Sequence, residues 1–224
     1  MSAPRLALFD LDHTLLSGDS DVLWCEFLMD RGELARGEFQ PRNDEMARRY
    51  GEGTVSAQDF CEFYVSTLAG RTLDEWRPWC ERFLREVIAP RIPTSATALV
   101  ESHRARGDVL VLTTATNRVL TALTAAHLRI DELLATEVEV VDGRCTGRTH
   151  GVLNMRDGKV TRLHGWLRER GWPVQTLAEA SAYSDSINDL PLLRAVGQPI
   201  AVDPDPRLRA QAADAGWPIL ELQR

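Results

Sequence analysis

Short apolar runs alternate with amphipathic stretches along most of the chain. Strand-like runs occupy residues 6–9, 109–112, 177–183, 199–202 and 219–222, and helical periodicity occupies 94–106, 117–127, 159–170 and 207–215. This alternation predicts an α/β fold with a parallel sheet that is covered by helices on both faces. Residues 137–141 and 144–149 flank Asp142–Gly143, a turn signal that predicts a small β-hairpin.

Residues 18–89 have a different pattern, with helical spacing and almost no strand signal. Helices are expected at 21–31, at 41–50, from the N-cap Ser56 to Leu68, and after a capping box formed by Thr72 and Glu75. Pro78 is expected to kink or restart the last of these helices. We therefore predict an α/β core made of 1–17 and 90–224, with an inserted all-helical cap at 18–89 that is hinged near Gly18 and residues 90–93.

The composition is that of a soluble globular protein and excludes several functions. Hydrophobic residues make up 44% and charged residues 26% of 224 residues, and the net charge of −7 argues against nonspecific nucleic-acid binding. The four cysteines are far apart, which favours reduced thiols over disulfides or a zinc site. Since no signal peptide or membrane-spanning run is found, we expect a cytoplasmic protein, a monomer or a homodimer, with a small-molecule partner.

Polar side chains follow the predicted strands where each strand ends. The first strand is followed by Asp10, Asp12 and Thr14; the second ends in Thr113, Thr114 and Thr116; a later strand is followed by Asp185, Asn188 and Asp189; and Lys159 begins a helix between them. Ligands of open parallel sheets bind at the carboxyl ends of the strands, so these groups are expected to converge. Neighbouring carboxylates repel unless a cation accompanies them, and oxygen ligands suit Mg²⁺. An isolated Asp-x-Asp also fits a merely polar strand exit.

These segments resemble, in order and spacing, the haloacid dehalogenase superfamily in its subclass IB, phosphoserine phosphatase-like branch. The resemblance is carried by Asp-Leu-Asp-His-Thr at 10–14, the strand ending at Thr114, Gly158–Lys159, and Tyr-Ser-Asp-Ser-Ile-Asn-Asp at 183–189. It implies a Rossmann-like core with a helical cap. It also implies hydrolysis of a phosphate monoester through an aspartyl phosphate, with Mg²⁺ as cofactor.

The resemblance also implies a role for each matching residue. Asp10 would be the nucleophile and Asp12 the general acid and base, while Thr114, Lys159 and Asn188 would bind phosphate or substrate. The implied Mg²⁺ ligands are Asp10, the main-chain carbonyl of Asp12, Asp185, and Asp189 directly or through water. Thr113 is the rival of Thr114, and Asn188 has an alternative role as a helix cap.

Substrate identity depends on Asp19. Phosphoserine phosphatases use Glu at this position for the substrate ammonium group, and the shorter Asp admits a larger amine-bearing ester such as histidinol phosphate. Asp19 also fits the N-cap of the first cap helix. Trp24, Trp76 and Trp79 fit either a substrate pocket or the core of the cap. The alternative functions are a phosphotransferase or mutase, and a catalytically silent phosphometabolite-binding protein.

Overall fold

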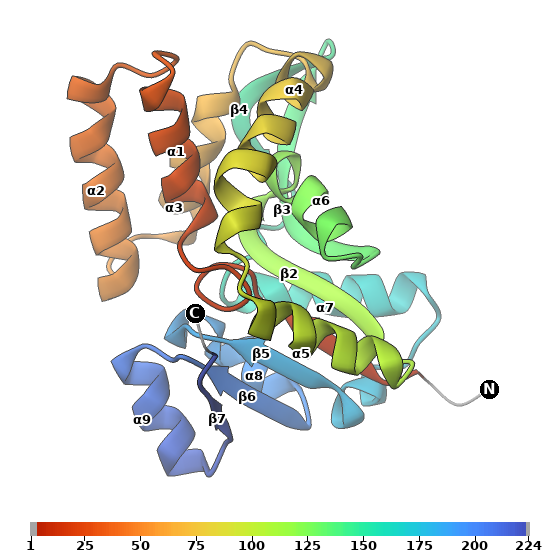
Figure 1. The fold of residues 1–224 in the computed structure, drawn as a ribbon. Coiled ribbons are helices and arrows are strands. Elements are labelled where there is room, and N and C mark those ends of the chain that lie inside the picture. Colours follow the sequence, from red (N-terminus) through yellow and green to blue (C-terminus); the bar gives the residue numbers. More distant parts are fainter. Residues whose placement is uncertain (1–3, 223–224) are drawn as a thin grey trace.

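The structure is a computed structural model that describes residues 4–222. Its centre is a sheet of seven strands in the order β4-β3-β2-β1-β5-β6-β7, in which every neighbouring pair is parallel except β3 and β4 (Figure 1). The strands are β1 (Leu6–Phe9), β2 (Val109–Asn117), β3 (Glu132–Val141), β4 (Arg144–His150), β5 (Ser181–Ser184), β6 (Gln198–Val202) and β7 (Ile219–Leu220). The predicted α/β class with a parallel sheet and a hairpin is thus confirmed.

Helices cover both faces of the sheet because the strand side chains alternate. Ala7 and Phe9 of β1 point into a core shared with α5 (Thr94–Ala105) and α6 (Arg118–His127). Leu6 and Leu8 point into a second core. The elements of that second core are α7 (Asp157–Glu169), α8 (Leu190–Ala195) and α9 (Pro206–Ala215). β1, buried on both faces, is therefore fixed at the centre of the molecule.

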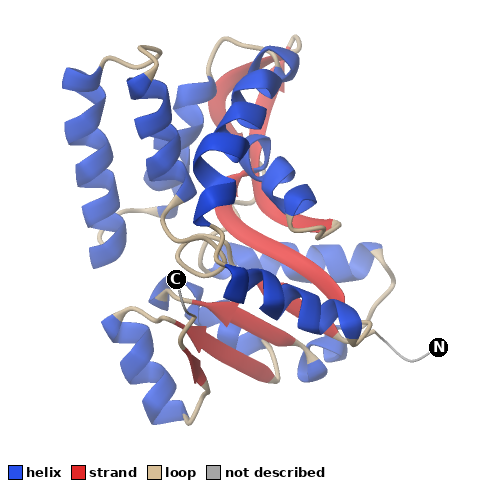
Figure 2. Cartoon of the chain, in the orientation of Figure 1, coloured by secondary structure: helices blue, strands red, loops and turns tan. Residues whose placement is uncertain are grey.

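The segment between β1 and β2 is helical, and Figure 2 shows no strand arrow in it. Its helices are α1 (Ser20–Asp30), α2 (Arg36–Glu52), α3 (Ala57–Val65) and α4 (Leu73–Phe83), followed by a π-helical turn at Leu84–Ile88. The hairpin contacts this segment, because the Gly70 N–H donates to the Cys145 carbonyl (2.8 Å) and the Cys145 N–H donates to the Arg71 carbonyl (2.9 Å). Below, "the cap" means residues 18–89.

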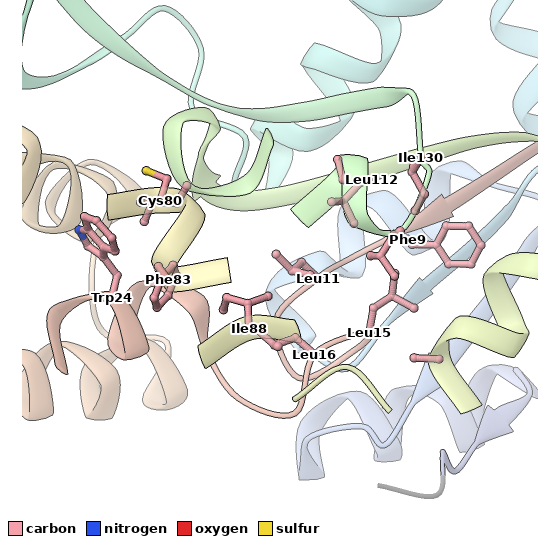
Figure 3. Close-up of a cluster of buried hydrophobic side chains, with 14 of the residues drawn as sticks. Phe9, Leu11, Leu15, Leu16, Trp24, Cys80, Phe83, Ile88, Leu112 and Ile130 are labelled. Carbon is pink, nitrogen blue, oxygen red and sulfur yellow. The ribbon is translucent and has the colours of Figure 1, made fainter. Parts of the chain in front are cut away.

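The predicted helix N-caps are present in the cap, and so is a core that contains tryptophan. Ser56 caps α3, and Thr72 and Glu75 form the capping box of α4. Trp24 and Trp76 are buried at 0% and 3% exposure and pack edge to face, so they belong to the core and not to a pocket. Figure 3 shows Trp24 beside Cys80 and Phe83 in this core.

Several expected element bounds are wrong for identifiable reasons. Residues 174–179 form a 3₁₀ helix, so the strand expected at 177–183 begins only at Ser181. β2 runs on to Asn117 through its polar end, because parallel pairing with β3 continues there across a register shift. α2 begins well before residue 41. Pro78 does not break α4, since it and Asp74, whose carbonyl would have lost its hydrogen-bond donor, are both exposed to solvent.

Candidate active site

The loop that follows β1 positions two carboxylates. The strand ends at Phe9, and the Asp10 N–H donates to the Tyr183 carbonyl (3.0 Å), so Asp10 still lies at the carboxyl end of the sheet. Leu11, Leu15 and Leu16 are fully buried and anchor the loop between the two parts of the chain (Figure 3). A tight turn begins at Leu11, so this turn, and not the side-chain alternation of an extended strand, orients Asp10 and Asp12.

Lys159 is the cation of the site. Its ammonium donates to Asp10 Oδ1 (2.7 Å) and to Asp189 Oδ2 (2.6 Å), and its side chain is 3% exposed. Of the 26 lysines and arginines in the chain, Lys159 is the only lysine. A compact ammonium fits an enclosed position between two carboxylates better than a planar guanidinium does.

Thr14 joins the first loop to the loop after β5. Its hydroxyl lies 3.2 Å from Asp10 Oδ2 and 3.1 Å from Asp185 Oδ1, and it accepts the Asp185 N–H (3.0 Å). Ser184 donates to the same Asp189 oxygen that Lys159 contacts (2.8 Å). The structure thus brings Asp10, Lys159, Asp185 and Asp189 together, although they are up to 179 positions apart in the sequence.

Burial dominates the electrostatics of these groups. Desolvation raises the pKa of Asp10 to about 7, against the lowering effect of Lys159. Desolvation, with the charges of Asp10 and Asp189, also raises the pKa of Asp185 well above its usual range. Burial alone would lower the pKa of Lys159, but Asp10 and Asp189 more than offset this and raise it. Lys159 is therefore protonated, and it supplies one positive charge beside the three carboxyl groups of Asp10, Asp185 and Asp189.

The Asp12 carboxyl is held by donors on one side. The Ser20 N–H donates to Asp12 Oδ1 (2.6 Å), and the hydroxyls of Thr114 (3.2 Å) and Thr116 (3.0 Å) donate to Asp12 Oδ2. Thr114 therefore faces the site. Thr113 is buried in another direction and accepts a hydrogen bond from Asn154 (3.0 Å).

Asp19 and Asn188 lie beside these carboxylates. Asp19 caps α1, as its Oδ1 accepts the N–H groups of Asp21 and Val22, yet it also lines the cavity above Asp10. Desolvation, followed by the charge of Asp12, raises the pKa of Asp19 to about 7. Asn188 accepts from Arg156 (3.2 Å) and is not a helix cap, because Ser186 caps the following 3₁₀ turn.

The cap covers the carboxylates and encloses a cavity of about 20 Å³. Tyr50, Phe60 and Met155 line it together with Asp10, Asp12, Asp19, Ala115, Thr116, Lys159, Asn188 and Asp189. A wider hollow of about 440 Å³ adjoins it and shares Asp19, Tyr50 and Asn188. Two arginines join cap and core: Arg156 donates to the Val55 carbonyl (3.0 Å), and Arg207 donates to the Gly51 carbonyl (2.9 Å).

The donor set fits Mg²⁺. Asp10 Oδ2 and Asp185 Oδ1 both lie within hydrogen-bonding distance of the Thr14 hydroxyl. Lys159 contacts the other oxygen of Asp10. Within residues 4–222, no three acidic, His or Cys side chains form a metal cluster. Two carboxylates are nevertheless sufficient, since Mg²⁺ commonly takes one or two carboxylates and fills its other positions with water and phosphate oxygens.

Comparison with known proteins identifies the family of the chain. Residues 7–194 match the family model of the haloacid dehalogenase-like hydrolases. The chain is 36% identical over 220 residues to a histidinol-phosphatase of Neisseria meningitidis, covering 98% of this chain and 99% of that protein. It is 33% identical over 227 residues to a phosphoserine phosphatase of Mycobacterium tuberculosis, covering 97% of this chain and 70% of that protein.

Solved structures give the same result for the fold. A protein of unknown function from Bordetella pertussis superposes with a TM-score of 0.93 at 43% identity, covering 99% of this chain and 100% of that one. A substrate-bound phosphoserine phosphatase superposes with a TM-score of 0.71 at 18% identity, covering 100% and 95%. The chain belongs to the haloacid dehalogenase-like hydrolase family. Within that family it is a phosphatase.

Sequence reasoning missed several residues that contact the site. Ser20 and Asp21 lie only at the start of the helix predicted at 21–31. Tyr50 lies at the end of the polar helix predicted at 41–50. Arg156 carried no signal, because its contacts at Asn188 and Val55 depend on how the cap lies on the core. The one available hint was the sequence Asp19-Ser20-Asp21, which places two acids around a hydroxyl.

In the part of the chain that the structure describes, no helix is both long and apolar enough to cross a bilayer.

Proposed function

We propose that the protein is a Mg²⁺-dependent phosphatase that cleaves a small amine-bearing phosphate monoester through an aspartyl phosphate on Asp10. The observation that carries this proposal is the contact of Lys159 with Asp10 and Asp189 (2.7 and 2.6 Å) beside Asp185. This contact supports the proposal because it brings a carboxyl group and a cation to one point, as nucleophilic attack on a phosphate requires. Mg²⁺, held by Asp10, Asp185 and the Asp12 carbonyl with Asp189 directly or through water, would neutralise charge on the phosphate and on Asp10.

In the first step, an oxygen of the Asp10 carboxylate attacks phosphorus and the P–O bond to the leaving group breaks. Asp12 gives its proton to the leaving alkoxide, and Lys159, Thr114 and Asn188 hold phosphoryl oxygens. In the second step, water attacks phosphorus, the bond between phosphorus and the Asp10 oxygen breaks to release phosphate and the free carboxylate, and the Asp12 carboxylate takes a proton from that water. One residue thus serves as acid and then as base. The cap excludes bulk water until the leaving group departs.

The chemistry of the cavity favours an amine with an aromatic ring over an amino acid as the leaving group. Asp19 presents a carboxyl and Tyr50 and Phe60 present rings, an arrangement that attracts a cationic or aromatic group. Among the described residues that line the enclosed cavity, Lys159 is the single cation, and it already contacts two carboxylates. A substrate carboxylate would therefore lack a partner in the enclosed cavity, and Arg207, which lines the adjoining hollow, already donates to the Gly51 carbonyl. This favours histidinol phosphate over phosphoserine, in line with the name of the relative from Neisseria.

Phosphate release from p-nitrophenyl phosphate tests the reaction class. We expect turnover with Mg²⁺ and a fall to background with EDTA, restored by added Mg²⁺, because the single charge of Lys159 does not balance both the carboxylates and the phosphate without the ion. A silent binding protein would show no metal-dependent turnover. A transferase would release product only when an acceptor alcohol is added.

Replacement of Asp19 tests the substrate class. Asp19→Asn should lower kcat/KM for histidinol phosphate by about 10- to 100-fold, since a charge-assisted hydrogen bond contributes about 1.5–3 kcal/mol. The same variant should change kcat/KM for p-nitrophenyl phosphate by less than about threefold, because Asn still caps α1. The measurement is initial rates for both esters with wild type and variant. Equal losses for both esters would show that Asp19 only caps the helix.

A further inference from the structure

Behind Asp12 lies a buried carboxyl that the proposed reaction does not use. Asp21 stands in the first turn of α1 at 2% exposure. Its Oδ2 lies 3.0 Å from the Thr116 hydroxyl, and its Oδ1 is buried without any hydrogen-bond partner. An ionised carboxylate in that state would be strongly disfavoured.

The Thr116 hydroxyl connects Asp21 to Asp12. It lies 3.0 Å from Asp12 Oδ2 and 3.0 Å from Asp21 Oδ2, and it accepts a hydrogen bond from the Ser20 hydroxyl (3.0 Å). A hydroxyl has a single proton, so Thr116 can donate to only one of the two carboxyls. The other carboxyl must then supply the proton of its own contact with Thr116.

Asp21 is the carboxyl better placed to supply that proton. Desolvation, with the charges of Asp19 and Asp12, raises the pKa of Asp21 well above its usual range. Asp12 has different surroundings, because the Ser20 N–H and the Thr114 hydroxyl also donate to it, whereas Asp21 Oδ1 has no donor. A neutral Asp21 donates to Thr116, and Thr116 then donates to Asp12.

We propose that Asp21 is a positioning residue that fixes the Thr116 hydroxyl toward Asp12 and so holds the Asp12 carboxyl in the orientation needed for proton transfer to the leaving group. This inference rests on the proposed function, in which Asp12 is the general acid. It assigns Asp21 and Thr116 to the acid half of the reaction and not to phosphate or metal binding.

The basicity of the leaving group separates this role from a structural one. Phenyl phosphate and p-nitrophenyl phosphate have nearly the same shape, but phenolate is far more basic and depends more on a proton donor. The Asp21→Leu and Thr116→Val variants should each lower kcat/KM for phenyl phosphate by about 10- to 100-fold and for p-nitrophenyl phosphate by less than about threefold. We compare kcat/KM values because they depend on the steps up to formation of the aspartyl phosphate and not on its later hydrolysis.

The matched variants make the test specific. Asp21→Asn keeps a neutral donor at Thr116 and should restore most of the rate with phenyl phosphate. Thr113→Val removes a buried hydroxyl on the same strand that faces Asn154, and it should leave the ratio between the two esters unchanged. The Asp21→Leu, Thr116→Val double variant should be no worse than either single variant, because both break one connection.

Three results would overturn the inference: equal losses on both esters, a loss in Asp21→Asn as large as in Asp21→Leu, or an unchanged ratio in Thr116→Val. If Asp21→Leu does not fold, as its thermal unfolding would reveal, Asp21→Asn and Thr116→Val still decide the question. Failure of the proposed function is seen separately, as absence of Mg²⁺-dependent turnover in the wild type.

Discussion

Asp10→Asn is expected to abolish turnover, lowering kcat/KM by at least about 10⁴-fold. An amide cannot attack phosphorus to form the acyl phosphate. The fold should persist, because Asn is nearly isosteric and its carbonyl can still accept from Lys159. It also removes a buried carboxyl that desolvation leaves with a pKa of about 7, so the metal-free variant should melt no lower than the wild type.

Initial rates with p-nitrophenyl phosphate and Mg²⁺, together with thermal unfolding followed by circular dichroism, check this prediction. Asp214→Asn makes the same chemical change on the exposed face of α9 and should alter neither quantity. Acid quenching during turnover should trap phosphate on the wild-type chain and none on Asp10→Asn. A variant with a rate within about tenfold of wild type would remove Asp10 from the nucleophile role.

Lys159→Met is expected to lower both activity and stability. The change leaves Asp10 and Asp189 without their shared ammonium, which should reduce kcat/KM by about 10³-fold or more. In EDTA at pH 8 the free energy of unfolding should fall by about 3–5 kcal/mol, the usual cost of breaking a buried ion pair. This cost should shrink toward pH 5, because the folded state then takes up protons on carboxyls whose pKa is already raised.

Urea unfolding of wild type and variant at both pH values measures this effect. Arg168→Met removes a cation from the exposed face of the same helix and should change the free energy of unfolding by no more than about 0.5 kcal/mol. Added Mg²⁺ should recover part of the stability of Lys159→Met, since the ion replaces positive charge beside Asp10. A variant equally stable at pH 8 and pH 5 would show that the carboxylates do not depend on Lys159.

The sequence predicts the fold and the main site residues because both depend on local patterns. Strand-like runs that end near Asp10, Thr114 and Asp185 predict that these residues lie together at the carboxyl end of a parallel sheet. The structure has them there. The preference for Thr114 over Thr113 rests on the resemblance to the family, and the contact of the Thr114 hydroxyl with Asp12 agrees with it. The resemblance to the family then places Lys159, whose segment alone would read as an ordinary helix start.

Other parts of the site depend on tertiary packing and have no local signature. The turn after β1 follows from burial of Leu11, Leu15 and Leu16, which requires the cap to be in place. Arg156 contacts Asn188 and Val55 from separate segments, so its role exists only in the folded chain. Asp21 reads as a favourable acid in a first helical turn, and only its burial beside Thr116 indicates more.

Because the sequence contains a single lysine, chemical modification of its amine can be used to follow the opening of the cap. Reagents that acylate lysine find no other lysine side chain in this sequence, and Lys159 lies beneath the cap at 2% exposure. The rate of its acylation, read by mass spectrometry of one peptide, would therefore report how often the cap lifts, and substrates that keep it closed would slow the labelling.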